Sequence, residues 1–285
     1  MERYYQIGGK RVAVVGDSLC TTLDAMPCMN PFHVEESSTD SFCQFVETEE
    51  ETPALEKTIY QLTDLDTTFL FGKTADGYCL QQLMDDGQRL ELWSHSDSHR
   101  LKIRGDWEHR MTRYALWLGY GMQGLHDGRL MPHGSCIVCH GEAILFLGES
   151  GTGKSTHTRL WGEHIAGARL LNDDGPVIRV EDDGSVWIYG SPWSGKTPCY
   201  RAERYPLKAC VRLSQAPYNQ MTKLPVLHAY AALHPSFPPA FAYDRYLYDL
   251  QSNLIGKVLS AVPCYHLACL PDADAARLSY HTLFG

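Results

Sequence analysis

A glycine-rich segment carries the residues best suited to chemistry in this sequence. Residues 148–155 read GESGTGKS and match the pattern G-x-x-x-x-G-K-[ST] at every fixed position. Glycines let backbone N–H groups curl inward around phosphate oxygens. The lysine reaches the β- and γ-phosphates, and the hydroxyl after it can ligate Mg²⁺. This P-loop (residues 148–155) therefore predicts an ATP site, contacted by Gly148, Ser150, Gly151, Thr152, Gly153, Lys154, Ser155 and Thr156.

An acidic pair follows the P-loop closely. Asp173 and Asp174 end an apolar run and precede Gly175-Pro176. Phosphoryl transfer needs a carboxylate that holds Mg²⁺ and a group that orients or deprotonates the acceptor. Neighbouring strand residues point to opposite faces, so both carboxylates can serve one site only where the strand breaks, as Gly175-Pro176 predicts. We expect Ser155 and Asp173 to hold Mg²⁺ and Asp174 to act as the base. The reverse division, and a polar strand end without a catalytic role, are the alternatives.

The elements on either side of the P-loop are those that the motif requires. Residues 143–147 form an apolar run that predicts a buried strand, and residues 156–166 follow a helical pattern closed by Gly167. The positive end of that helix would then lie beside the bound phosphates. A glycine-rich turn that matches the motif by chance is the alternative.

Short strands separated by turns occupy the first part of the chain. Residues 4–7 and 11–15 predict a hairpin. Residues 59–103 alternate short segments with Asp-Gly turns, which predicts an antiparallel sheet. We therefore expect a β-rich N-terminal region over residues 1–105.

Helices and strands alternate in the second part of the chain. Asp106 is expected to cap a helix. Residues 106–285 are then predicted to form a P-loop kinase-like α/β domain. Its further strands are expected near 170–174, 177–180, 186–189, 207–213 and 264–270, and its further helices over 244–262 and 272–283.

Composition excludes several classes of protein. The 285 residues are 44% hydrophobic and 21% charged, which is typical of a globular chain, and the formal charge of −9 argues against a general nucleic-acid or membrane binder. No signal peptide and no apolar run of transmembrane length is recognised, so a cytoplasmic location is expected. The ten cysteines are then expected to be reduced thiols.

The segment order resembles a known kinase family. The P-loop followed closely by Leu171-Asn172-Asp173-Asp174 is similar to the catalytic domain of HPr kinase/phosphorylase, and more distantly to ATP-dependent phosphoenolpyruvate carboxykinase. The wider set includes free-serine kinases and lasso-peptide kinases. The resemblance covers roughly residues 130–285 and also rests on His133-Gly134, residues 191–196, residues 265–267 and Pro271-Asp272.

This resemblance implies both an architecture and an activity. The fold would be α/β, with a mixed sheet and the P-loop at one edge of a cleft. The activity would be transfer of the γ-phosphoryl group from ATP, with Mg²⁺, to a hydroxyl on a protein, a peptide or a small molecule, and the acceptor is expected to be a serine. His133 would lie near the phosphates, and the protein would form homo-oligomers as its relatives do.

Two residues are candidates for the substrate side. Lys196 and Arg201 lie in or beside a loop rich in glycine, proline and serine, and both could pair with phosphate or with substrate anions. A solvated hairpin is the alternative for that loop. Two alternatives also stand for the whole chain, namely an ATP-sensing module without catalysis and a carboxykinase-type enzyme.

Overall fold

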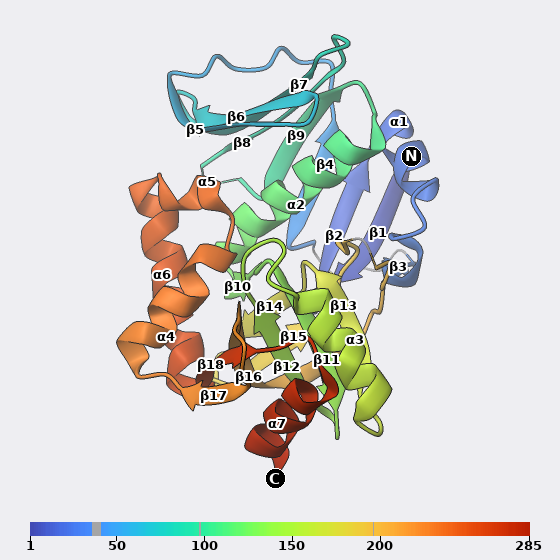
Figure 1. The fold of residues 1–285 in the computed structure, drawn as a ribbon. Coiled ribbons are helices and arrows are strands. Elements are labelled where there is room, and N and C mark those ends of the chain that lie inside the picture. Colours follow the sequence, from blue (N-terminus) through green and yellow to red (C-terminus); the bar gives the residue numbers. More distant parts are fainter. Residues whose placement is uncertain (36–40, 97, 196) are drawn as a thin grey trace. The chain divides into compact units, whose positions relative to one another are not determined.

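The computed structural model describes residues 1–35, 41–96, 98–195 and 197–285. It divides the chain into two compact units (Figure 1). Unit 1 comprises Met1–Asp127 and Pro239–Tyr248, and unit 2 comprises Gly128–Pro238 and Asp249–Gly285. The described residues form two mixed β-sheets and seven α-helices, so the protein is of the mixed α/β type that the sequence predicts. The sequence predicts a division into residues 1–105 and residues 106–285, and that these are separate domains stays a prediction.

Unit 1 is built on a nine-stranded sheet with the strand order β3-β1-β2-β4-β9-β8-β7-β6-β5. The predicted hairpin and the predicted antiparallel sheet are both confirmed, as β1 with β2 and as β5 to β9. Strand β4 lies parallel to both β2 and β9, a pairing that the sequence did not predict. The strands are β1 (Glu2–Ile7), β2 (Lys10–Val15), β3 (His33–Val34), β4 (Cys43–Glu47), β5 (Lys57–Asp64), β6 (Thr67–Lys73), β7 (Gly77–Met84), β8 (Arg89–His95) and β9 (Arg100–Gly105).

Helix α2 (His109–Leu125) packs closely on the sheet of unit 1. A Cβ added at Gly119 would lie 2.8 Å from Leu101 Cδ2, so this glycine permits the close approach. The prediction that Asp106 caps the helix is wrong. Glu108 is the N-cap and accepts a hydrogen bond from the Met111 backbone N–H at 2.7 Å, whereas the Asp106 carboxylate accepts from the Arg89 N–H. The short helices α1 (Asp17–Asp24) and α5 (Pro239–Ala242) complete unit 1.

Unit 2 contains the second sheet, in which β10-β14-β15-β16-β12-β11-β13 form one path and β18 pairs with both β16 and β17. Strands β12, β16 and β18 are parallel neighbours, so their carboxyl ends lie at one edge. The strands are β10 (Arg129–Leu130), β11 (Gly134–Cys139), β12 (Glu142–Leu147), β13 (Arg169–Asp174), β14 (Val177–Val180), β15 (Val186–Tyr189), β16 (Arg204–Gln215), β17 (Gln220–Lys223) and β18 (Cys264–Cys269).

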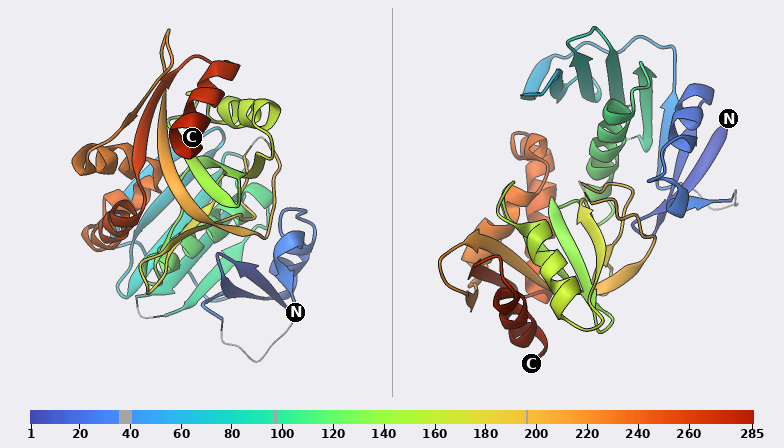
Figure 2. Two further views of the ribbon diagram at one scale, coloured as in Figure 1. Left: turned by 90° about the horizontal axis from the view of Figure 1, so that it is seen from below. Right: turned by 45° about the vertical axis from the view of Figure 1, so that its right-hand side comes forward.

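Two helices pack beside each other on one face of this sheet (Figure 2). They are α3 (Lys154–His164) and α7 (Ala273–Phe284), and both correspond to predicted helices. Alternate residues of β12 and β16 point at them, which fills the core of unit 2 with apolar side chains. This core comprises Ile137, Cys139, Ile144, Phe146, Leu160, Trp161, Ile165, Val211, Leu213, Leu267 and Ala276.

Helices α4 (Val226–Leu233) and α6 (Arg245–Ala261) follow strand β17 in the chain. The predicted helix over 244–262 is confirmed as α6, in which the boundary between the units falls. Helix α4 was not predicted, and it packs against β16 and β18. It leads directly into a 3₁₀ turn, η2 (His234–Ser236).

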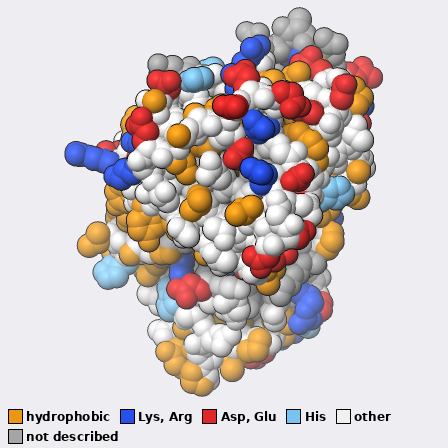
Figure 3. Space-filling view, turned by 90° about the horizontal axis from the view of Figure 1, so that it is seen from above, with side chains coloured by type: hydrophobic (Ala, Val, Ile, Leu, Met, Phe, Trp, Pro, Cys, Tyr) orange, Lys and Arg blue, Asp and Glu red, His pale blue; other side chains and the backbone are white. Residues whose placement is uncertain are grey.

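The surface and the thiols agree with the composition. Acidic and basic side chains are intermixed on the face shown in Figure 3. Within the described ranges, no helix combines the length and the apolar character needed to cross a bilayer. All ten cysteines are free thiols, eight of them buried.

Candidate active site

Residues 148–155 form a tight loop between β12 and α3. Gly148 has a φ of 155°, and Gly153, at the N-cap of α3, is left-handed with a φ of 100°. A Cβ at Gly148 would lie 2.5 Å from Thr152 Oγ1, so a side chain is excluded there. The Thr152 hydroxyl itself donates to the carbonyl oxygen of Glu149 at 2.8 Å. A curled, glycine-rich loop that leads into a helix N-terminus is the arrangement that binds phosphate through backbone N–H groups.

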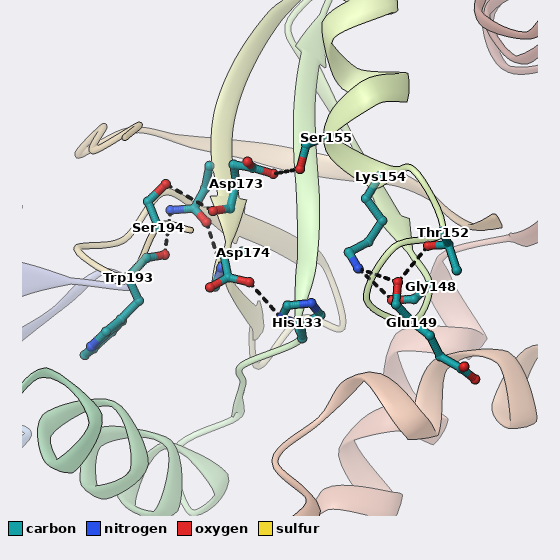
Figure 4. A network of polar contacts seen from close by, with 12 residues as sticks. His133, Gly148, Glu149, Thr152, Lys154, Ser155, Asp173, Asp174, Trp193 and Ser194 are labelled. Carbon is teal, nitrogen blue, oxygen red and sulfur yellow. Dashed lines mark hydrogen bonds and ion pairs between the residues drawn. The ribbon is translucent and has the colours of Figure 1, made fainter. Parts of the chain in front are cut away.

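The ammonium group of Lys154 is held inside its own loop. Its Nζ donates to the carbonyl oxygens of Gly148 at 2.7 Å and Glu149 at 3.1 Å (Figure 4). Burial lowers the pKa of Lys154, while the carboxylates of Asp174 and Asp173 act in the opposite direction. A cation held by neutral carbonyls is well placed to exchange them for phosphate oxygens.

Ser155 and Asp173, the two residues that the sequence predicts to hold a metal ion, lie in contact with each other. The Ser155 hydroxyl donates to Asp173 Oδ1 at 3.0 Å, and Asp173 is buried. Among the described residues, no group of three or more His, Cys, Asp or Glu side chains could hold a metal ion. One carboxylate and one hydroxyl nevertheless fit Mg²⁺, because this ion keeps several waters and takes further oxygens from substrate phosphates.

Asp174 and His133 form a second polar pair beside the first. His133 Nδ1 lies 2.7 Å from Asp174 Oδ1, with both side chains partly exposed (Figure 4). Asp174 has a φ of 129°, which is rare for a residue with a side chain. This turn of the backbone ends the regular alternation of β13. Asp173 therefore faces Ser155 while Asp174 faces His133, at the same end of the strand.

Strand β11 joins the two halves of the site. It runs antiparallel to both β12 and β13, and Gly134 pairs with Leu147 on one side and Asp174 on the other. Two strand spacings amount to about 10 Å, which is the separation expected between the ends of β12 and β13. A Cβ at Gly134 would lie 2.9 Å from the backbone carbonyl oxygen of Phe146, so glycine is favoured at this junction. His133 immediately precedes it and thus lies between the P-loop and the acidic pair.

A buried polar cluster fixes the end of β13. The Asn172 side-chain amide donates to the carbonyl oxygen of Trp193 at 3.2 Å and accepts from the Gly175 N–H at 3.0 Å. The Ser191 hydroxyl donates to the carbonyl oxygen of Gly175 at 2.6 Å. Ser194, also fully buried, donates to the carbonyl oxygen of Asp173 at 3.0 Å. The loop after β15 therefore supports the acidic pair, a role that its serine-rich sequence did not reveal on its own.

The predicted substrate residues lie on this same loop or just after it. Lys196 lies outside the described residues. Arg201 is exposed, and its Nη1 lies 3.8 Å from Glu203 Oε1.

The P-loop residues Ser150, Gly151 and Thr152 line one cavity, and Gly151, Thr152, Gly153 and Thr156 line another.

The two cavities lie beside the P-loop, and each has both polar and apolar lining residues. One has a volume of about 540 Å³, and Leu213, Leu270 and Pro271 give it an apolar wall. The other has a volume of about 690 Å³ and includes the polar side chains of Arg212 and His266. An apolar wall beside the N-terminus of α3 suits a flat base, and a cationic wall suits an anion.

The end of β16 contributes residues that the sequence analysis missed. Gln215 donates from Nε2 to the carbonyl oxygen of Gly151 at 3.1 Å, and Ser214 Oγ lies 2.9 Å from His266 Nε2. Arg212 Nη2 lies 3.6 Å from Glu149 Oε1. The available signal was a charged residue, Arg212, near the end of the largely apolar predicted strand 207–213.

No protein-family model matches the chain, and no curated protein sequence matches it either. What this site does is therefore inferred from its own geometry.

Proposed function

We propose that the protein is an ATP- and Mg²⁺-dependent kinase that phosphorylates a hydroxyl group, of the type that the HPr-kinase-like resemblance implies. One observation carries the proposal: the P-loop, the Ser155–Asp173 pair and the His133–Asp174 pair meet at one edge of one sheet. A site that only bound nucleotide would need the P-loop and the Ser155–Asp173 pair. The His133–Asp174 pair adds a second carboxylate, which is not part of the predicted metal-binding pair.

The donor side uses residues 148–156. Backbone N–H groups of the loop and the N-terminus of α3 would hold the phosphates, and Lys154 would leave its two carbonyl partners to neutralise them. Ser155 and Asp173 would hold Mg²⁺, which supplies charge neutralisation on the phosphate oxygens. The apolar cavity beside Thr156 is the nearest space for the nucleoside.

The acceptor side uses Asp174. Its carboxylate would accept the proton of the acceptor hydroxyl as that oxygen bonds to the γ-phosphorus and the bond from phosphorus to the β–γ bridging oxygen breaks. The products are a phosphate ester and ADP. His133 would hold this carboxylate in place through the contact of 2.7 Å. This division of labour follows the observed contacts, because Asp173 is bonded to Ser155 and Asp174 is not.

Asp174→Asn tests the function directly. Loss of the base should lower phosphoryl transfer by at least about a hundredfold, while the affinity for ATP stays near that of the native protein. The measurement follows γ-labelled ATP, with Mg²⁺ and size-fractionated lysate of the host, into a protein band or a small molecule. Glu163→Gln, on the exposed part of α3, is the matched control.

The label also separates transfer from sensing. Label on one band or one compound, absent with Asp174→Asn, supports the kinase and identifies its acceptor class. Slow release of free phosphate at the same rate in both proteins would contradict the kinase and favour a nucleotide-sensing module.

A further inference from the structure

Strand β16 places the charged side chain of Arg212 between two buried apolar residues. Val211 and Leu213 are buried in the core against α3 and α7. Because strand side chains alternate, Arg212 between them points to the opposite face of the sheet. Its side chain is only 19% exposed, which is unusual for an arginine.

Arg212 is anchored on one side and loosely paired on the other. Its Nη1 donates to the carbonyl oxygen of Ala232 at 3.1 Å and contacts Ser236 Oγ at 3.4 Å. Its Nη2 lies 3.6 Å from Glu149 Oε1, and the side chain of Glu149, on the P-loop, is 83% exposed. An ion pair this long with an exposed carboxylate contributes little free energy, so it is easily exchanged.

The surroundings of Arg212 favour a phosphate group. The cavity of about 690 Å³ is lined by residues 149–152 of the P-loop together with Arg212. Arg212 and the backbone N–H groups of the P-loop can therefore contact the same anion.

We propose that Arg212 is a second phosphate-binding cation, which rests on Glu149 in the ligand-free loop and transfers to the terminal phosphate when a nucleoside triphosphate binds. The inference rests on the proposed kinase function. The planar guanidinium can bind two phosphate oxygens at once and stabilise the charge that develops on the transferred group. Arg212 would then be a catalytic residue, and Glu149 would hold it in position until the triphosphate arrives.

Separate affinities for ATP and ADP distinguish this role from a structural one. Arg212→Gln should weaken ATP binding about tenfold and change ADP binding by less than about twofold, because only ATP carries the phosphate that Arg212 contacts. Turnover should fall by about 10³-fold, as for other arginines that contact a transferred phosphoryl group. Glu149→Gln should strengthen ATP binding about twofold to fivefold, since it removes the competing carboxylate.

Arg277→Gln is the matched control. Arg277 lies on α7, where it pairs with Asp274 at 2.9 Å, and its substitution should leave both affinities unchanged. Calorimetric titration with each nucleotide in the presence of Mg²⁺ gives the affinities, and thermal melting reports the fold of each variant. If Arg212→Gln does not fold, Arg212→Lys and Glu149→Gln decide the question, because both keep the packing of this region.

The outcomes separate the inference from the proposed function. Equal losses for ATP and ADP, or no loss with Arg212→Gln and no gain with Glu149→Gln, would overturn the role of Arg212 and leave the kinase standing. Failure of the native protein to bind either nucleotide would overturn both. A selective loss of ATP affinity together with a gain for Glu149→Gln establishes the exchange.

Discussion

At the scale of single residues, Asp174 combines strain with exposure. Its φ of 129° belongs to a region that glycine tolerates far better than any residue with a Cβ. The strain is held by neighbours on both sides, because Asp174 bridges to Ser194 and its carboxylate contacts His133. Because of this strained backbone, the Asp174 side chain points to His133 although the preceding residue, Asp173, faces Ser155.

This strain predicts an unusual order of stability. Asp174→Gly and Asp174→Ala both remove the carboxylate. They differ only in the Cβ of alanine, which disfavours a positive φ. The glycine variant should be the more stable by about 1 kcal/mol, which reverses the usual preference for alanine. Urea unfolding of both variants measures the difference. A more stable alanine variant would show that the backbone at residue 174 relaxes without cost.

At the scale of secondary-structure elements, a buried hydrogen-bond cluster joins α3 to α7. The Trp161 indole N–H donates to Ser279 Oγ at 2.9 Å and approaches His157 Nε2 at 3.2 Å. Ser279 Oγ also lies 3.2 Å from His157 Nε2. The indole can only donate, and burial disfavours the charged form of His157, so the imidazole in this cluster is neutral. The cluster holds the helix that begins at Lys154.

The cluster makes stability depend on pH. Burial lowers the pKa of His157 to about 4, whereas an unfolded histidine titrates near 6.5. Between these values the unfolded chain binds the extra proton, so stability falls as the pH drops from about 6.5 to about 4. The loss should approach about 3 kcal/mol over that window.

His157→Gln should abolish this part of the pH dependence. Chemical unfolding at pH 7 and pH 4.5 measures it, and His164→Gln, on the same helix, is the control that should retain it. An unchanged slope in the His157 variant would mean that other groups carry the acid sensitivity.

How far the sequence predicts these elements depends on the range of the interactions. The strand before the P-loop, α3, the acidic pair and α6 were predictable because their signals are local: glycine spacing, apolar periodicity and a break at Gly175-Pro176. The parallel pairing of β12 with β16 was not, because the partners lie about 60 residues apart and share no local pattern. For the same reason Arg212 was missed, since only that pairing brings β16 beside the P-loop.

At the scale of the whole molecule, the chain enters unit 1 twice. Residues 239–248 return to unit 1 after most of unit 2. There Asp244 is 5% exposed and has three kinds of partner. It accepts from the Tyr78 hydroxyl at 2.8 Å, pairs with Lys73 at 2.9 Å and accepts from the backbone N–H groups that open α6.

Asp244→Ala should therefore destabilise the protein strongly. It would leave the Tyr78 hydroxyl without its acceptor and remove an N-cap, at a combined cost of about 2 to 4 kcal/mol. Asp182→Ala, on an exposed turn, is the control and should change the free energy of unfolding by less than about 0.5 kcal/mol. Thermal unfolding followed by circular dichroism compares them. A loss equal to that of the control would show that the returning segment contributes little to unit 1.

The returning segment also orders events during synthesis. A ribosome makes the chain from the N-terminus at about 5 to 20 residues per second, and domains generally fold as they emerge. Here the sheet of unit 1 is complete in sequence by Gly105, yet Tyr78 and Lys73 gain their partner only when Asp244 has been made, after most of unit 2. The last β-strand of unit 2 ends with Cys269, 25 residues after Asp244. Neither unit can finish folding on a nascent chain much before the other, so a truncated product would expose both incomplete cores to chaperones and proteases.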